Sequence, residues 1–129
     1  MPLSKNKLFE KIAYTPHSEY QRYFHDSEAR FRVACCGRRF GKTQMAGHEM
    51  TAALMDIEKP ERYYWIVGPS YKLGEKEFRV VVSDLRKLGI YDKCRVTYSP
   101  KVGDMSVTMP WKTKLEVMSA EKKDSLQGE

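Results

Sequence analysis

The chain has 129 residues, of which 41% are hydrophobic and 31% are charged, and its formal net charge is +6 at pH 7. This balance predicts one globular domain and excludes a disordered chain, and no apolar run approaches the roughly 18 residues that span a bilayer. The three cysteines lack the spacing of a zinc site or a disulfide framework, which favours an intracellular setting.

Two short helices are predicted before residue 28. Residues 4–13 are expected to form a basic helix, which ends at the turn signal of residues 14–17. Thr15 is the predicted N-cap of the next helix and Pro16 its first residue, since proline lacks the N–H group that this position leaves unpaired. This second helix is expected over residues 17–25, and the histidines of the chain lack the spacing of metal ligands.

Residues 36–43, Cys-Gly-Arg-Arg-Phe-Gly-Lys-Thr, are the most informative stretch of the chain. A phosphate-binding loop has the pattern Gly, four residues, Gly-Lys-Ser/Thr; Cys36 replaces the first glycine, whereas Gly41, Lys42 and Thr43 match. In such a loop the backbone N–H groups and a helix N-terminus cradle the phosphates, the lysine reaches the β- and γ-phosphates, and the hydroxyl binds Mg²⁺. The alternative is an ordinary strand-to-helix turn with an exposed basic pair.

The segments on either side of this loop favour the phosphate-binding interpretation. Residues 31–36 are short and largely apolar, which predicts a buried parallel strand. Residues 42–57 predict a helix whose apolar face consists of Ala46, Met50, Ala53, Leu54 and Ile57. Strand, glycine turn and helix therefore follow in the order that the loop requires.

The rest of the chain predicts an α/β fold. Residues 63–67 predict a strand whose aromatic side chains pack in the core, with base stacking as the alternative. A helix is expected to begin near Glu75 and to end before Gly89 as its C′ residue. Three further strands, of which the first two form a late hairpin, are predicted at residues 95–98, 105–109 and 115–118. This order indicates a mainly parallel sheet flanked by helices.

Hydrolysis of a nucleotide also requires an acidic residue at a strand end to hold Mg²⁺, and a group that positions the attacking water. Residues 52–56 and 80–84 imitate the acidic strand, but both fit helical periodicity better and neither Asp56 nor Asp84 is followed by glutamate. We therefore expect this chain to bind phosphates and to lack the groups that complete hydrolysis.

With these features, the sequence resembles the N-terminal part of the ATPase domain of the large terminase subunit, the motor that packages DNA into the heads of tailed phages. Residues 14–17 with Gln21 are similar to the family's adenine-recognition segment, and residues 29–43 to its Gly-Arg-Arg-x-Gly-Lys-Thr/Ser loop. Residues 64–71 are similar to its second strand. Residues 119–128 are similar to the loop before its magnesium-acid strand, with Gln127 where the family often has arginine.

The resemblance implies a P-loop NTPase fold of the RecA/ASCE type, incomplete in this chain, with ATP and Mg²⁺ as cofactors. It implies catalytic roles for Lys42, Arg38 and Arg39, a Mg²⁺ contact from Thr43 and recognition of adenine by Gln21. The alternative for each arginine is a surface charge, and for Gln21 a solvated helix face. The implied nucleotide contacts are Cys36, Gly37, Arg38, Arg39, Phe40, Gly41, Lys42, Thr43 and Gln21.

The resemblance also implies how the chain is divided and what it works with. Residues 1–28 are the expected leader with the adenine-recognition segment, and residues 29–129 the P-loop core. The expected acidic strand and the family's nuclease domain are absent, so we expect a fragment that does not turn over ATP by itself. The implied partners are double-stranded DNA, a portal protein, a small terminase subunit and further copies of the chain. No membrane is expected, and the implied location is the host cytoplasm, transiently at the procapsid portal.

Two other functions remain open at this stage. One is a helicase-like, nucleic-acid-dependent ATPase that does not package DNA. The other is a nucleotide- or anion-binding module that never hydrolyses its ligand. The positive net charge is compatible with a nucleic-acid partner, but a solvated basic surface explains it equally well.

Overall fold

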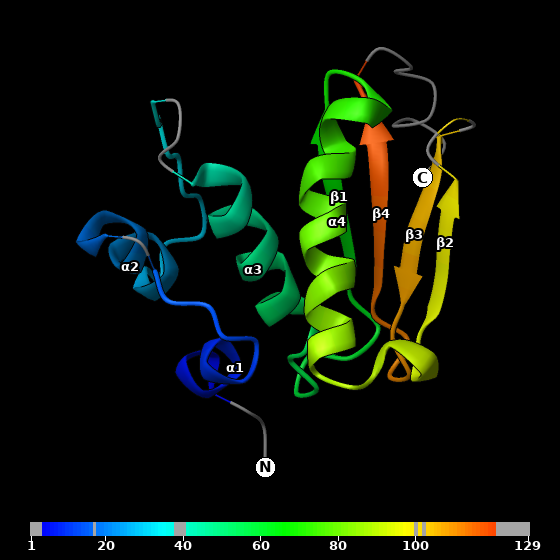
Figure 1. The fold of residues 1–129 in the computed structure, drawn as a ribbon, viewed down its shortest axis with the longest axis horizontal. Coiled ribbons are helices and arrows are strands. Elements are labelled where there is room, and N and C mark those ends of the chain that lie inside the picture. Colours follow the sequence, from blue (N-terminus) through cyan, green and yellow to red (C-terminus); the bar gives the residue numbers. More distant parts are fainter. Residues whose placement is uncertain (1–3, 17, 38–40, 100, 102, 121–129) are drawn as a thin grey trace.

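Helix α4 (Tyr71–Lys87) lies across one face of a four-stranded sheet, and a group of three shorter helices lies to its side (Figure 1). This arrangement comes from a computed structural model, which describes residues 4–16, 18–37, 41–99, 101 and 103–120. Among these residues no helix combines the length and the apolar character needed to cross a membrane.

The sheet is mixed and has the strand order β1-β4-β3-β2. Strand β1 (Tyr63–Gly68) runs parallel to β4 (Lys114–Ser119), which pairs antiparallel with β3 (Asp104–Thr108). Strand β3 in turn pairs antiparallel with β2 (Arg95–Ser99), which confirms the predicted late hairpin. The predicted α/β class is confirmed, but the described sheet is mixed and not mainly parallel as expected, because it has one parallel and two antiparallel pairs.

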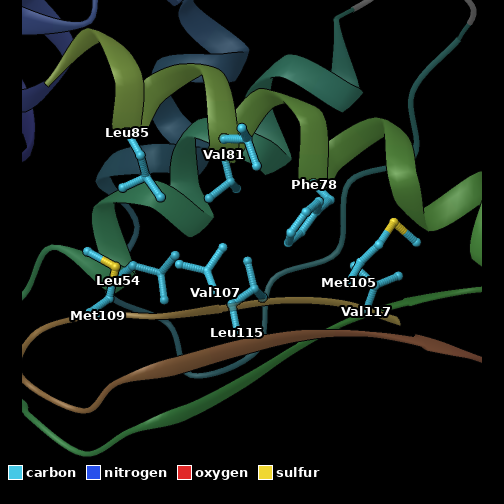
Figure 2. Packing of buried hydrophobic residues seen from close by; sticks show 10 residues of the cluster. Leu54, Phe78, Val81, Leu85, Met105, Val107, Met109, Leu115 and Val117 are labelled. Carbon is cyan, nitrogen blue, oxygen red and sulfur yellow. The ribbon is translucent and has the colours of Figure 1, made fainter. Parts of the chain in front are cut away.

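The main core lies between α4 and the sheet. Figure 2 shows Phe78, Val81 and Leu85 of α4 pointing toward Val107 of β3 and Leu115 of β4. All five side chains are fully buried. Burying an apolar side chain of this size stabilises the fold by about 1.5–3 kcal/mol, so this layer is the main apolar contribution that the described structure offers.

Helix α4 begins earlier than the sequence suggested. Ser70 is its N-cap and accepts a hydrogen bond from Leu73 N at 3.4 Å, so Gly74 lies inside the helix. A β-carbon at Gly74 would lie 2.8 Å from Val117 Cγ1, which shows that this glycine lets the helix approach β4 closely. The helix ends as predicted, because Gly89 follows the C-cap with a φ of +75°.

The two helices of the leader form, with one corrected boundary. Helix α1 (Lys5–Lys11) agrees with the predicted basic helix. Helix α2 (Glu19–Asp26) is capped by Ser18, whose hydroxyl accepts from Gln21 N at 3.4 Å. The predicted cap at Thr15 is therefore wrong, because Ser18 is the residue placed to satisfy the N–H group three positions further on.

Helix α3 (Lys42–Leu54) ends three residues before the predicted limit, and its buried face only partly agrees with the predicted one, sharing the fully buried Leu54. Gly47, His48, Thr51 and Leu54 are buried, whereas Ala46 of the predicted face is exposed. A β-carbon at residue 47 would lie 2.6 Å from Val80 of α4. The absence of a side chain at Gly47 thus decides which face of α3 packs on α4.

The predicted buried strand at residues 31–36 is wrong. This segment has no strand assignment, and Phe31 and Val33 are 80% and 87% exposed. Burial of a strand requires a ladder partner and a packed face, and the described ladder pairs β1 with β4 alone. For the same reason β1 is an edge strand, so Tyr63 (46% exposed) and Trp65 (37% exposed) are not core residues as predicted.

Candidate nucleotide-binding site

The phosphate-binding pattern ends at the N-terminus of α3. Gly41 is the N-cap and has a φ of +86°, a left-handed conformation that glycine adopts without strain. Lys42 and Thr43 are the first two residues of the helix, and Lys42 is exposed. The first turn contains no acidic residue and Gly41 offers no side-chain cap, so the N–H groups of this turn are suited to an anion.

This helix end faces the carboxyl end of β1, the strand that runs parallel to β4. Lys42 and Thr43 line one groove together with Gly68 and Pro69 at the end of β1, and the groove has a volume of about 500 Å³. Ala120 N donates to Gly68 O at 2.9 Å, which joins the carboxyl ends of β4 and β1. Ligands of open α/β sheets bind beyond the carboxyl ends of the strands, and Lys42 lies at that position here.

Gln21 of α2 reaches the same helix end from the leader. Its side chain is 1% exposed, which excludes the alternative of a solvated helix face. A β-carbon at Gly41 would lie 2.8 Å from Gln21 Nε2, so the amide packs directly against the last loop residue before the helix. The hydroxyl of Tyr14, also from the adenine-like segment, lies 3.5 Å from Gln21 Oε1.

The structure therefore brings Gln21, Gly41, Lys42 and Thr43 together. Cys36 is half-buried and Gly37 exposed, both on the approach to the loop. Arg38, Arg39 and Phe40 lie outside the described residues, as do the residues similar to the family's later loop, 121–128.

Sequence reasoning missed an ionic cluster around Glu49 of α3. Its carboxylate accepts from Lys5 Nζ at 2.8 Å, from Arg32 at 3.0 Å, and pairs with His25 Nδ1 at 2.6 Å. Burial acts to raise the pKa of Glu49, but the hydrogen bonds from His25, Lys5 and Arg32 outweigh it and lower the pKa to about 2. One carboxylate thus ties α1, α2 and the segment before the loop to α3.

A second polar contact joins α3 to α4. His48 Nδ1 lies 2.6 Å from Asp84 Oδ2, which also accepts from the Thr51 hydroxyl at 2.8 Å. Asp84 is fully buried on α4. This confirms the prediction that residues 80–84 are helical and that Asp84 does not lie at a strand end. The ring of Tyr14 packs on His48 at a centroid distance of 4.0 Å, and burial, with the nearby Glu49 charge, raises the pKa of Tyr14 to about 12.

The signal for these two clusters was weak in the sequence. Glu49 meets partners 17, 24 and 44 residues away, and His48 meets Asp84 across 36 residues. Neither spacing is a local pattern, and helical periodicity identifies only which residues share a face.

A mixed α/β sheet with flanking helices, with a Gly-Lys-Thr helix start at its carboxyl edge, defines the chain as part of a P-loop NTPase fold. No protein-family model matches the chain. Two curated relatives, the large terminase subunits of Thermus phage G20c and Thermus virus P23-45, are each 37% identical over 83 residues. That match spans 64% of this chain and 16% of each relative's length.

Solved structures of a large terminase ATPase domain are also similar to this chain, over nearly its whole length. The large terminase ATPase domain of Thermus phage P74-26 has a TM-score of 0.76 and 28% identity, with 100% of this chain and 55% of that chain covered. A variant of that domain with one arginine changed to alanine has a TM-score of 0.74, also at 28% identity, over 98% and 54%. Over 83 residues the chain is homologous to the large terminase subunits of these two Thermus phages, and its fold is similar to part of a large terminase ATPase domain.

Proposed function

We propose that this chain is the ATP-binding part of a DNA-packaging motor, a large terminase subunit that couples ATP hydrolysis to translocation of double-stranded DNA into a procapsid. The main support for the proposal is that the buried side-chain amide of Gln21, in the leader, contacts the N-terminus of α3. Gln21 packs on the left-handed Gly41, and Lys42 and Thr43 follow at once beside the strand ends. The relatives' names support the packaging role.

Each described residue has a chemical role in this proposal. The Lys42 ammonium neutralises charge on the β- and γ-phosphates, while the N–H groups of the first turn of α3 hold phosphate oxygens. The Gln21 side chain offers both a donor and an acceptor, as recognition of the adenine edge requires. Its burial against Gly41 fixes where that amide lies.

The Thr43 hydroxyl fits the proposed Mg²⁺, since it is an oxygen donor on the first turn of α3 and lines the groove at the end of β1. Mg²⁺ held there would neutralise charge on the phosphates of the nucleotide. The part of this chain within the described residues contributes the hydroxyl; Asp84 is buried against His48 and is not available as a second ligand.

The remaining loop residues complete the proposal. The backbone of Cys36, Gly37 and Phe40 cradles the phosphates, and Arg38 and Arg39 stabilise charge that develops on the γ-phosphoryl group. Residues 1–28 act as the leader that carries the adenine contact and residues 29–129 as the P-loop core. By itself we expect the chain to bind ATP without steady turnover.

The proposed partners are double-stranded DNA, a portal protein, a small terminase subunit and further copies of the chain. The proposed place of action is the host cytoplasm and, transiently, the procapsid portal. These proposals rest on the resemblance to large terminase subunits, and the matched region spans 16% of each curated relative.

ATP titration of the 129-residue chain tests the nucleotide site. Lys42→Ala is expected to weaken ATP binding at least tenfold, because the charge on the phosphates loses its partner; a tenfold loss corresponds to about 1.4 kcal/mol. Lys59→Ala, which removes an exposed lysine from a loop, is the matched control and is expected to leave the affinity unchanged. Equal affinities of the wild-type chain and Lys42→Ala would contradict the proposal.

A further inference from the structure

The face of α4 that points away from the sheet is basic along its whole length. Seven positions of α4 are exposed, and five of them carry a cation while none carries an acid. The whole chain is far more balanced, with 23 lysines and arginines against 17 acids. The five cations of this basic face are Lys72, Lys76, Arg79, Arg86 and Lys87.

The acids of α4 are turned away from the basic face. Asp84 is fully buried and bound to His48 and Thr51, and Glu77 is half-buried. Glu75 is 9% exposed and accepts hydrogen bonds from Arg79 and from the Tyr98 hydroxyl. Arg79 thus pairs with Glu75, at 3.1 Å, and the other four cations of the basic face have no exposed acid of α4 beside them.

Stability of the helix does not account for this pattern. A helix N-terminus favours acids, yet the first turn of α4 contains none, and Lys72 is its second residue. Only Arg86 and Lys87, in the last turn, lie where the helix dipole favours a cation. Lys72 in the first turn thus opposes the dipole, and the dipole does not favour Lys76 or Arg79 in the middle of the helix.

The basic face continues into a groove between α4 and α3. Lys76, Arg79 and Lys87 of α4 line it, and Thr43 and Gln44 line it from α3; its volume is about 430 Å³. The hydrogen-bonded pair of His48 and the fully buried Asp84 also lines it. Thr43 is also the proposed Mg²⁺ contact, so the groove adjoins the proposed nucleotide site. Cations, a hydroxyl and an amide together are suited to phosphate oxygens.

We propose that the basic face of α4 binds the sugar–phosphate backbone of double-stranded DNA. The inference rests on the proposed function, from which DNA is taken as the polyanion. From Lys72 to Lys87 the helix rises about 22 Å at about 1.5 Å per residue, which matches about six base pairs at about 3.4 Å each. Contacts of this kind fix the position of DNA without reading its sequence.

Binding of a fluorescent 20-base-pair duplex, followed by anisotropy from 50 to 200 mM salt, tests the surface. The double variant Lys72→Gln, Lys76→Gln is expected to bind the duplex about tenfold more weakly than the wild-type chain does at 50 mM salt. The loss is expected to be the same for two duplexes of unrelated base sequence. The log–log salt slope of this variant is expected to fall by about 2, because two phosphate contacts are lost. The matched control Lys7→Gln, Lys59→Gln changes the net charge equally and is expected to bind as the wild-type chain does.

The outcomes separate this surface from the nucleotide site. The proposed surface would be overturned if the α4 variant and the control lost DNA affinity equally, or if neither lost any. It would also be overturned if the wild-type chain bound ATP but no DNA. A change in sedimentation of the α4 variant with DNA binding intact would make the face a contact between copies of the chain and also overturn it. Loss of ATP affinity in Lys42→Ala is measured separately and tests only the proposed function. If the α4 variant loses its circular dichroism, Lys76→Gln with Lys87→Gln tests the same face.

Discussion

The unit of α4 and the sheet is joined by different forces from the unit of α1, α2 and α3. Between α4 and the sheet, fully buried apolar side chains such as Phe78 and Leu115 form the main contact, and the hydrogen bond from the Tyr98 hydroxyl to Glu75 lies at its edge. Around α3, the links between elements converge on two carboxylates, Glu49 and Asp84. Apolar burial supplies stability without fixing direction, whereas hydrogen-bonded ion pairs such as those of Glu49 also fix orientation. The helical unit, which holds Gln21 against Gly41, is the part that needs a fixed orientation.

The largest effect is expected from breaking the apolar unit. Phe78→Ala removes a fully buried ring at the centre of the core and is expected to lower the free energy of unfolding by about 3–5 kcal/mol, including the cavity term. Urea unfolding measured by circular dichroism checks this. Val33→Ala is the control: the side chain is 87% exposed, and a change above about 0.5 kcal/mol would show that residues 31–36 are packed.

A smaller effect is expected from breaking the polar unit. Glu49→Gln keeps the shape of the side chain but removes the charge that Lys5, His25 and Arg32 share. We expect the free energy that protects α1 and α2 from local unfolding to fall by about 1–2 kcal/mol. Amide hydrogen exchange would show this as faster exchange in α1 and α2, with little change in α4 and the sheet. Equal protection of α1 and α2 in the variant and the wild-type chain would show that the cluster does not hold the leader.

The same cluster predicts a pH dependence. The pKa of Glu49 is about 2 in the folded chain against an ordinary value of 4.5, so the ionised form stabilises the fold. This contribution is complete above about pH 4.5 and is lost as the pH falls from 4.5 toward 2. The stability difference between the wild-type chain and Glu49→Gln is therefore expected to shrink across that window. A constant difference would contradict the assignment.

The sequence predicted those elements whose signals are local. Helix α1, the end of α4 at Gly89 and the β2–β3 hairpin depend on periodicity and turn residues within short windows, and all three form. Residues 31–36 have the composition of a buried strand, but burial depends on a ladder partner elsewhere in the chain. The packed face of α3 was only partly predicted because it depends on Gly47 meeting Val80, a contact that helical periodicity does not contain.

The sequence predicted the residues of the candidate site but not the polar contacts that hold the surrounding helices in place. Gly41, Lys42 and Thr43 were found from their pattern, and Gln21 from its resemblance to an adenine segment. The cluster at Glu49 joins residues from four segments far apart in the sequence, so only the fold reveals it. Polar networks of this kind are long-range by nature, whereas the phosphate loop is one contiguous motif.

In the proposed function, the leader and the start of α3 form one nucleotide site. Its most direct test is calorimetric titration of ATP and GTP into the wild-type chain and Gln21→Ala. The wild-type chain is expected to bind ATP more tightly than GTP. In Gln21→Ala the ratio of the two affinities is expected to fall about fivefold, which is about 1 kcal/mol. Lys42→Ala is expected to weaken the binding of both nucleotides. A Gln21→Ala chain that still folds and keeps the full preference for ATP would contradict the account.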